Sequence, residues 1–461
     1  MKLSTLAGRL WVPAFANSND AYIPEVWAAE SLMVLFEKLV MAQMVHRDFE
    51  NEIQQHGDTV NTRRPAKFTS TRKIDSDSVT TSDATSTNVA VVLNQHHHVS
   101  FVIKDGEASK SMQSLVNLYL EPAVRAIAQA IDELLLGERY NFVFQVVGSL
   151  GTALTKSTII AADVKLTEQL CPPDQRFLVV TPSSKGDLLG VAEFTNAEKI
   201  GDGGMAMRTG ELGNLLGFQT HMSPNCKSMA VTDVVTGAIN AGNLTVGSTV
   251  LTVNGLSAAI EAGTWCTIAG DMTPQVISAS VGGATPTQIT IYPGLASAIV
   301  NTAVVTLYAP LHVDLVAGYV TNWQKAIVVD NATIAPKTGQ MLSVGSGSTT
   351  VRYGLMATPT TTSILPNRPT EAALAHTAVL GLGPKGDYNF GFHKNAIGLI
   401  SRPLATPPEG VGAKSAVASI NGIGVRVVMT YDGSAQGTRV TVDLLCGTKT
   451  LDTNLGVVVL A

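Results

Sequence analysis

The chain has 461 residues and a formal net charge of −5, so no global basic field indicates a nucleic-acid-binding or membrane-surface protein. The length suffices for roughly two to four domains with a large core. Charged residues make up only 15% of the chain, against about 25% in typical soluble domains. So few charges are expected where contacts with other chains hide much of the surface, although a very large core would give the same composition.

The chain carries no clear export or membrane signal. Its four cysteines are far apart and form no CxxC pair, so we interpret them as reduced thiols of a protein made in the cytosol. The A-x-A pattern of a signal-peptide cleavage site occurs at Ala14, Phe15 and Ala16. The apolar segment before it is interrupted by Arg9 and Pro13, so we expect no cleaved signal peptide. No apolar run is long enough to span a bilayer.

The segment 1–54 is predicted as a loose arm followed by a helix. The helix "PEVWAAESLMVLFEKLVMAQMV" begins at Pro24, a residue that suits a first helical position. Leu32, Leu35 and Leu39 follow helical spacing, which indicates one buried face.

The segment 55–106 is predicted as one long β-hairpin. A basic, Thr-rich part leads to the polar tip "TTSDATSTN", and "VAVVLNQHHHVSFVIKD" then alternates apolar and polar residues as a strand does. Arms of roughly twenty residues would extend about 60 Å at ~3.3 Å per residue. Because an isolated two-stranded ribbon is marginally stable in water, this hairpin needs a supporting surface from its own domain or from another subunit.

A long helix with one buried stripe is predicted within the segment 107–144. In "SMQSLVNLYLEPAVRAIAQAIDELLLG", Leu120, Val124, Ile127, Ile131 and Leu134 are spaced by four, three, four and three residues. A proline at position 122 should kink this helix or mark its true start. The segment 145–227 alternates the strand "RFLVVTP" with "KGDLLGVAEF" and "TGELGNLLG", two short helices or turns, and is predicted as a compact α+β region.

The segment 228–311 is predicted as an inserted β domain, a small barrel or sandwich. Short strands recur at regular spacing, and no lysine or arginine occurs from Thr232 to Pro310. The segment 312–384 echoes it weakly at a spacing of roughly 75 residues. "GTWCTIAG" matches "GQMLSVGS", "QVISA" resembles "YGLMA", and "VVTLYAP" resembles "AVLGLGP", so 312–384 is either a loose repeat or a chance match. The segment 385–461 returns to strands that close the main body.

None of the catalytic or nucleotide-binding motifs in the sequence has its proper context. The GxGxxG match "GLGPKG" is followed by "DYNFGFHK" rather than by a helix, and "GVGAKS" has alanine where a phosphate-binding loop requires glycine. We therefore expect no enzyme and no cofactor.

Three consecutive histidines form the most distinctive motif. On a strand, His96 and His98 face one way and His97 faces the other, so the three are not one cluster. The pair His96 and His98 could supply two metal ligands, but a site needs a third ligand. The nearest carboxylate in sequence, Asp105, faces the opposite side. We expect no metal; a pH-sensitive subunit contact and a plain polar strand face are the alternatives.

The most charged stretch lies in the predicted hairpin. Nucleic-acid contact is one reading, but aromatic residues are limited to Phe68, and aspartates dilute the positive field. Ion pairing with another subunit is the preferred interpretation, and a solvated loop is the plain alternative. The candidate subunit-contact residues, with the two outer histidines, are Arg63, Arg64, Lys67, Arg72, Lys73, Asp75, His96 and His98.

Taken in order, these segments resemble the major capsid proteins of tailed bacteriophages with the Hong Kong 97 fold. The residues that carry the resemblance are "LNQHHHVSFVIKD", "EPAVRAIAQAIDELLLG", "RFLVVTP", "FTNAEKIGDGGMAMRTGELGNLLGFQTHMSPN", "NFGFHKNAIGLISRPLA" and "GVRVVMTYDGSAQGTRVTVDLLCGTKTLDTNLGVVVLA". The similarity is greatest to coat proteins of short-tailed phages that carry an inserted β domain. The resemblance implies an α+β fold with an N-terminal arm, an extended loop, a spine helix in a peripheral domain, an axial domain and the insertion.

The same resemblance implies the function and the partners. Identical subunits would form pentamers and hexamers of an icosahedral shell around double-stranded DNA, which they would contact non-specifically. Portal proteins and scaffolding or cement proteins would be further partners, with no membrane. The subunits would be made in the cytoplasm of a bacterial host and would end in the virion. The alternatives are a tail-tube or surface-layer subunit and, from a different class, a metalloenzyme that uses His96 and His98.

Overall fold

The computed structural model describes most of the chain in separate stretches. These are residues 24–47, 59–64, 70–76, 78–79, 81, 87–105, 119–195, 209–229, 234–242, 244–256, 259–313, 327–330, 336–356, 363–371, 374–375, 378–408, 412–420 and 423–461. Within them, no helix is both long enough and apolar enough to cross a membrane. These described residues have mixed α+β architecture, with two sheets, two closed barrels and a separate two-stranded ribbon.

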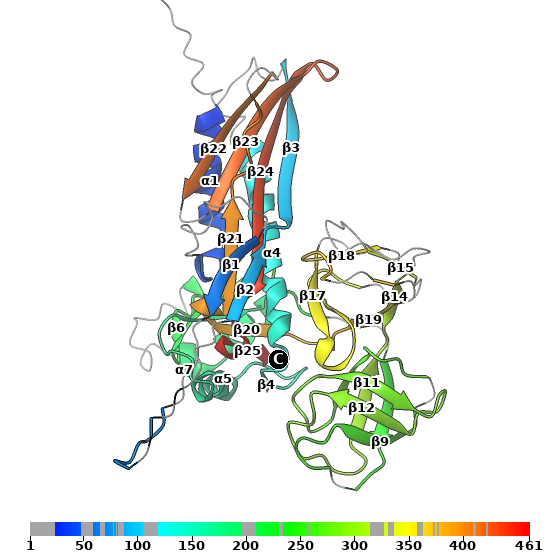
Figure 1. Ribbon diagram of the computed structural model, residues 1–461. Coiled ribbons are helices and arrows are strands. Elements are labelled where there is room, and N and C mark those ends of the chain that lie inside the picture. The colour runs from blue at the N-terminus through cyan, green and yellow to red at the C-terminus, as the bar shows by residue number, and fades with distance from the viewer. Residues whose placement is uncertain are drawn as a thin grey trace, which may run out of the picture.

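An elongated sheet with two helices on one face forms the body in the upper part of Figure 1. Its strands lie in the order β21 (Ile397–Arg402), β24 (Gly437–Thr450), β23 (Ile423–Asp432) and β22 (Ala413–Ile420), and β3 (Gln95–Lys104) pairs with β24. The helices α1 (Pro24–Lys38) and α4 (Glu121–Gly137) pack on this sheet and on each other. Pro122 occupies the first turn of α4, so it marks the start of the helix rather than a kink.

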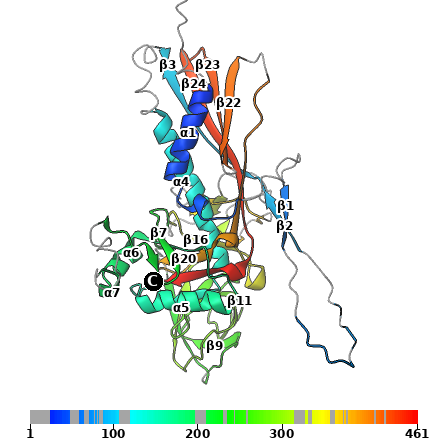
Figure 2. The same cartoon turned by 90° about the vertical axis from the view of Figure 1, so that its left-hand side faces the viewer.

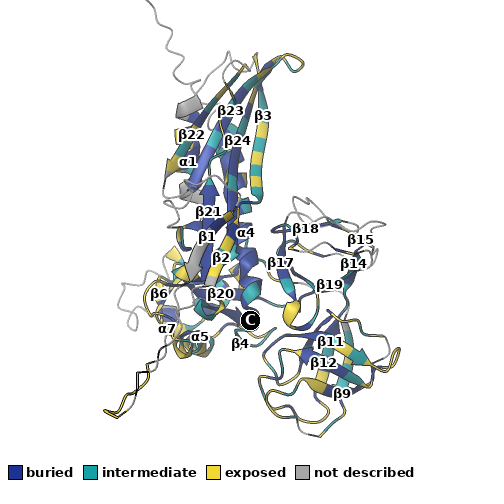
Figure 3. Cartoon of the chain, in the orientation of Figure 1, coloured by how far each residue is buried: buried dark blue, intermediate teal, exposed yellow. Residues whose placement is uncertain are grey.

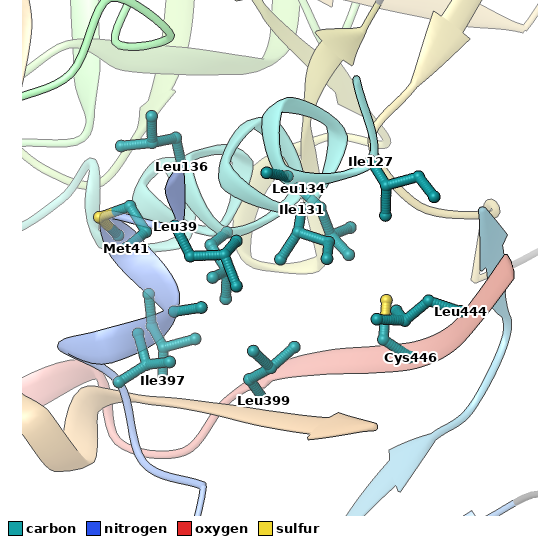
Figure 4. Packing of buried hydrophobic residues seen from close by; sticks show 14 of the residues in the cluster. Leu39, Met41, Ile127, Ile131, Leu134, Leu136, Ile397, Leu399, Leu444 and Cys446 are labelled. Atoms are coloured by element: carbon teal, nitrogen blue, oxygen red, sulfur yellow. The ribbon is translucent and has the colours of Figure 1, made fainter. Parts of the chain in front are cut away.

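The body core lies between these two layers (Figure 4). The stripe predicted for α4 is buried, and Val124, Ile127, Ile131 and Leu134 are each at most 2% exposed. They meet Leu399 and other apolar residues of β21 and β24. Burial of each such side chain contributes about 1.5–3 kcal/mol, so this stripe anchors the helix to the sheet.

A second sheet lies at the lower end of the body (Figure 1). Its order is β4 (Val146–Gly148), β25 (Gly456–Leu460), β20 (Tyr388–His393), β5 (Arg176–Val180), β7 (Phe218–Met222) and β6 (Asn214–Leu215). The strands β5 and β7 are parallel. Three helices accompany this sheet: α5 (Lys156–Glu168), α6 (Pro182–Leu189) and α7 (Ala192–Thr195).

Two closed six-stranded barrels occupy the lower right of Figure 1. Barrel 1 consists of β8 (Val234–Ile239), β9 (Val250–Asn254), β10 (Trp265–Ile268), β11 (Gln275–Val281), β12 (Gln288–Tyr292) and β13 (Val304–Tyr308). Barrel 2 consists of β14 (Leu311–Val313), β15 (Ile327–Asp330), β16 (Met341–Val344), β17 (Val351–Met356), β18 (Ser363–Pro366) and β19 (Val379–Leu382).

The two barrels have the same topology. In each barrel all neighbouring strands are antiparallel. The first strand in the sequence pairs with the second and the sixth strand, and the third strand pairs with the fourth and the sixth. The fifth strand pairs with the second and the fourth, which closes the barrel. The three sequence matches fall on equivalent strands, namely β10 and β16, β11 and β17, and β13 and β19. The last match is one residue out of register, because Cys266 pairs with Leu307 and its equivalent Leu342 pairs with Leu382. An identical strand order supports repetition of one module rather than a chance match.

The prediction of one long hairpin over 55–106 is wrong for its last part, residues 95–104. The strands β1 (Thr59–Arg64) and β2 (Thr87–Val92) form a ribbon, but β3 leaves it and pairs along its whole length with β24. Phe101 on β3 stacks between Trp27 and Tyr119, so the apolar face of β3 belongs to the body core. Alternation shows that a segment is a strand, but not which strand it pairs with.

The segment "TGELGNLLG", predicted as a short helix or turn, contains a turn and, from residue 210 on, no regular helix. Residues 214–218 form a tight hairpin, in which Leu215 pairs with Phe218 and the turn residues are Leu216 and Gly217. The segment "KGDLLGVAEF" does contain helices, the end of α6 and most of α7.

Candidate subunit-contact surfaces

Within the part of the arm that the structure describes, the β1–β2 ribbon packs on the body at its base. Val60, Val91 and Leu93 are at most 7% exposed and form a small apolar cluster with Ile400 of β21. Figure 2 shows β1 and β2 at the side of the body. The base therefore has a core of its own, and the rest of the arm extends beyond it.

The basic candidates are spread along this arm rather than gathered into one site. Arg63 and Arg64 lie on β1 and pair with Asn88 and Thr87 of β2. Lys67 lies outside the described residues. Further along, Arg72, Lys73 and Asp75 are exposed near the tip.

The histidines have two environments, as the strand alternation predicts. His96 and His98 are exposed on the outer face of the body sheet, with ring centroids 5.7 Å apart. His97 is half-buried on the inner face. Burial lowers the pKa of His97, and the charges of His96 and His98 lower it further. The buried Nε2 atom of His97 has no hydrogen-bond partner among the described residues.

The carboxylate next to the outer histidines is Asp443, which no local sequence pattern identified. Asp443 on β24 pairs with His98, and its Oδ2 lies 3.6 Å from His96 Nε2. Arg426 of β23 donates to both carboxylate oxygens, at 3.0 and 2.5 Å. In contrast, Asp105 accepts a hydrogen bond from the Tyr431 hydroxyl at 3.1 Å, away from the histidines. Among the described residues, no group of three or more histidine, cysteine or acidic residues could hold a metal ion.

The barrels are joined to the body by a buried junction that sequence reasoning missed. Arg368, which follows β18, donates to both oxygens of Glu138, at 3.0 and 3.2 Å, just after the end of α4. The Tyr140 hydroxyl donates to the Gly339 carbonyl. Asn367 donates to the Leu134 carbonyl at 3.2 Å. Barrel 2 is therefore fixed to the last turn of α4 by side chains that only the fold brings together.

The same junction includes aromatic and inter-barrel contacts. The Arg352 guanidinium of barrel 2 lies over the Phe144 ring of the body, 4.0 Å from its centroid, and burial lowers the pKa of Arg352 to about 10. Phe144 also packs edge-to-face against Tyr292 of barrel 1. Trp265 of barrel 1 donates to the Ser343 hydroxyl of barrel 2 at 2.7 Å. Body and barrels thus share one packed interface.

The sequence matches no protein-family model and no curated protein. The chain is similar in structure to a protein of Mycobacterium phage Che8, with 13% sequence identity, 91% of this chain and 90% of that chain covered, and a TM-score of 0.43. It is also similar to the capsid structure of cyanophage P-SCSP1u, with 10% identity, 92% and 88% covered, and a TM-score of 0.42. The asymmetric unit of the bacteriophage PhiM1 mature capsid gives 9% identity, 88% and 83% covered, and a TM-score of 0.38. The last two are described as capsids.

Proposed function

We propose that the chain is the major capsid protein of a tailed bacteriophage, which assembles with identical copies into an icosahedral head shell around double-stranded DNA. The observation that carries this proposal is the β1–β2 ribbon, an arm anchored at its base and extended away from its own body (Figure 2). The proposed role of the chain is structural rather than catalytic, and this role requires no cofactor.

The arm is built to lie on another molecule. The described residues of its distal part, 70–76, 78–79 and 81, are all exposed, and Ile74 and Val79 are 65% and 74% exposed. A two-stranded ribbon is marginally stable by itself in water, and exposed large apolar side chains favour contact with a partner surface. In a closed shell, many such weak contacts act together, so each one need not be strong.

We propose a Hong Kong 97-like assignment of the parts. The sheet with α1 and α4 forms the peripheral domain with its spine helix, and the sheet with α5, α6 and α7 forms the axial domain. The two barrels form the insertion, and the ribbon is the extended loop. Pentamers and hexamers of this subunit, a portal, and scaffolding or cement proteins complete the proposed assembly in the host cytoplasm. The basic arm residues Arg72 and Lys73 would pair with acidic groups of the neighbouring subunit.

Shell formation tests this proposal directly. Electron microscopy of the purified chain should show closed shells. Open tubes or flat lattices would instead support a tail-tube or surface-layer subunit, and stoichiometric zinc in the purified protein would support the metalloenzyme.

Removal of the distal arm should abolish shells without unfolding the chain. Arg64 and Thr87 are direct cross-strand partners, so Asn-Gly can replace residues 65–86 and close the ribbon as a two-residue turn. The buried base with Val60 and Val91 then stays intact. We expect an unchanged circular dichroism spectrum and a monomer in sedimentation. Normal shells from this variant would contradict the role of the arm.

A milder variant serves as the matched control. Ile74→Ser combined with Val79→Ser keeps the arm length and its charges but removes two exposed apolar groups. Shells should still form, at a higher protein concentration than for the unaltered chain.

A further inference from the structure

The strand β3 connects the arm to the body and lies at an edge of the body sheet (Figure 1). It follows β2 after two residues and precedes α4 in the chain. Within the part of the chain that the structure describes, β3 pairs with β24 alone. An edge strand is held by one ladder of hydrogen bonds, so part of it can separate without opening the rest of the sheet.

The upper half of β3, residues 99–104, is held to the body core by apolar side chains. Ile103 is 3% exposed. The Phe101 ring stacks between Trp27 and Tyr119, with centroid distances of 6.4 and 5.8 Å. Opening this half would expose these side chains to water, at about 1.5–3 kcal/mol for each large apolar group.

The lower half of β3, residues 95–98, has the sequence "QHHH" and no apolar side chain. On its inner face, the Nε2 atom of His97 is buried and has no hydrogen-bond partner among the described residues. The residue opposite His97 on β24 is Leu444, which belongs to the body core. A neutral imidazole is tolerated here, but an imidazolium would be a buried charge whose second N–H finds no acceptor.

The charged groups on the sheet do not compensate such a charge. His96 and His98 flank His97 on the outer face and are themselves cationic in acid. The nearest carboxylate on the neighbouring strand, Asp443, also faces outward. Both of its oxygens already accept hydrogen bonds from Arg426 on β23. Acid therefore places three positive charges on consecutive residues, beside one carboxylate that is already neutralised.

The helices packed on the inner face do not supply a counter-charge either. The described ionisable residues of α4 are Glu121, Arg125, Asp132 and Glu133. Glu121 and Arg125 pair with each other at 2.8 Å, and Asp132 accepts hydrogen bonds from the backbone that follows α1. On α1, Glu30 is exposed. Burial lowers the pKa of His97, and the charges of the two neighbouring histidines lower it further; no acidic group opposes them.

We propose that acid opens the lower half of β3 and converts it into a hinge between the arm and the body. The upper half stays on β24, so the opening stops near residue 99. The arm then depends on its apolar base cluster for its position on the body. This inference goes beyond the capsid function, because it concerns the single chain and requires no assembly.

The direction of the change follows from proton binding. In the closed strand His97 stays neutral, whereas in the open strand it takes up a proton near its ordinary pKa of 6.5. The open form therefore gains relative to the closed form as the pH falls below 6.5. For one histidine this gain reaches at most about thirtyfold in the opening equilibrium at pH 5.

Amide hydrogen exchange of the dissociated chain, followed by mass spectrometry at pH 7.5 and pH 5, tests the hinge. After correction for the intrinsic effect of pH, peptides of the lower half should exchange about three- to thirtyfold faster at pH 5. The upper half serves as an internal control and should keep its protection. Equal protection of the lower half at both pH values would overturn the proposal.

Two variants locate the effect on His97. His97→Phe keeps a ring on the inner face but cannot titrate, so the lower half should be equally protected at pH 7.5 and pH 5. The matched control His98→Phe changes the outer face and should retain the opening in acid. Acid opening that persists in His97→Phe would overturn the role assigned to His97.

A second measurement needs no variant. Exchange of the imidazole Cε1 hydrogen reports the ionisation of each histidine in the unaltered chain, and His97 should titrate below 6.5. A pKa of His97 at or above 6.5 would overturn the hinge. Neither measurement involves shells, so failure of the hinge leaves the capsid function intact, and absence of shells leaves the hinge intact.

Discussion

Replacement of Glu138 by alanine is expected to destabilise the folded chain by about 3 kcal/mol, because it leaves the buried guanidinium of Arg368 with only the exposed Glu371 carboxylate, 3.5 Å away, as a counter-charge. The Glu138 side chain is fully buried and that of Arg368 is 9% exposed. The same carboxylate also accepts hydrogen bonds from Asn141 at 2.7 Å and from Thr450 at 3.0 Å. The loss should appear as a lower urea midpoint and as faster amide exchange in residues 363–371.

A double variant distinguishes the charge effect from the packing effect. Glu138→Met with Arg368→Met removes both charges and keeps most of the volume, so it should recover most of the lost stability. The exposed pair Arg439–Asp432 provides the control, since loss of a surface ion pair costs about 0–1 kcal/mol. Equal effects of Glu138→Ala and Arg439→Ala would show that the buried pair does not join barrel to body.

The stability of the body is expected to fall as the pH rises from about 4 to 7, owing to one buried carboxyl group. Asp132 on α4 is 3% exposed and accepts backbone hydrogen bonds from Met41 at 3.1 Å and Val40 at 3.4 Å. Burial raises the pKa of Asp132 from 3.8 to about 7, although both hydrogen bonds favour the charged form. The group thus joins α4 to the turn that follows α1.

The direction of this change in stability with pH follows from proton binding. Between pH 4 and 7 the folded chain holds the Asp132 proton and the unfolded chain has released it, so rising pH favours unfolding. The stabilisation is complete below pH 3.8 and is lost as the pH passes through about 7. The difference between these two pKa values corresponds to about 4 kcal/mol.

Urea unfolding of the dissociated chain across this pH range provides the measurement. Asp132→Asn should abolish this part of the pH dependence, because asparagine does not titrate. In the control Asp432→Asn, hydrogen bonds from Ser434 lower the pKa of the replaced carboxyl, so the slope between pH 4 and 7 should remain. If the stability of Asp132→Asn still falls between pH 4 and 7, a group other than Asp132 causes the pH dependence.

Several features could be predicted because they depend on neighbours in sequence. The buried stripe of α4 follows from residues three and four apart, and Pro122 marks its start. The opposite orientation of His97 and its two neighbours follows from strand alternation alone. The β-rich insertion and its echo were visible as short strands at regular spacing, even though the spacing could not show that both segments close into barrels with one strand order.

The sequence by itself determined most of the helices and strands, which of their faces are apolar, and that the chain carries fewer charges than a typical soluble domain. The tertiary structure decided the partners: β3 joins β24 instead of extending the ribbon, Asp443 lies beside His96, and Glu138 meets Arg368. The physical reason is range, since helical and strand periodicity act over a few residues, whereas pairing joins residues up to hundreds of positions apart.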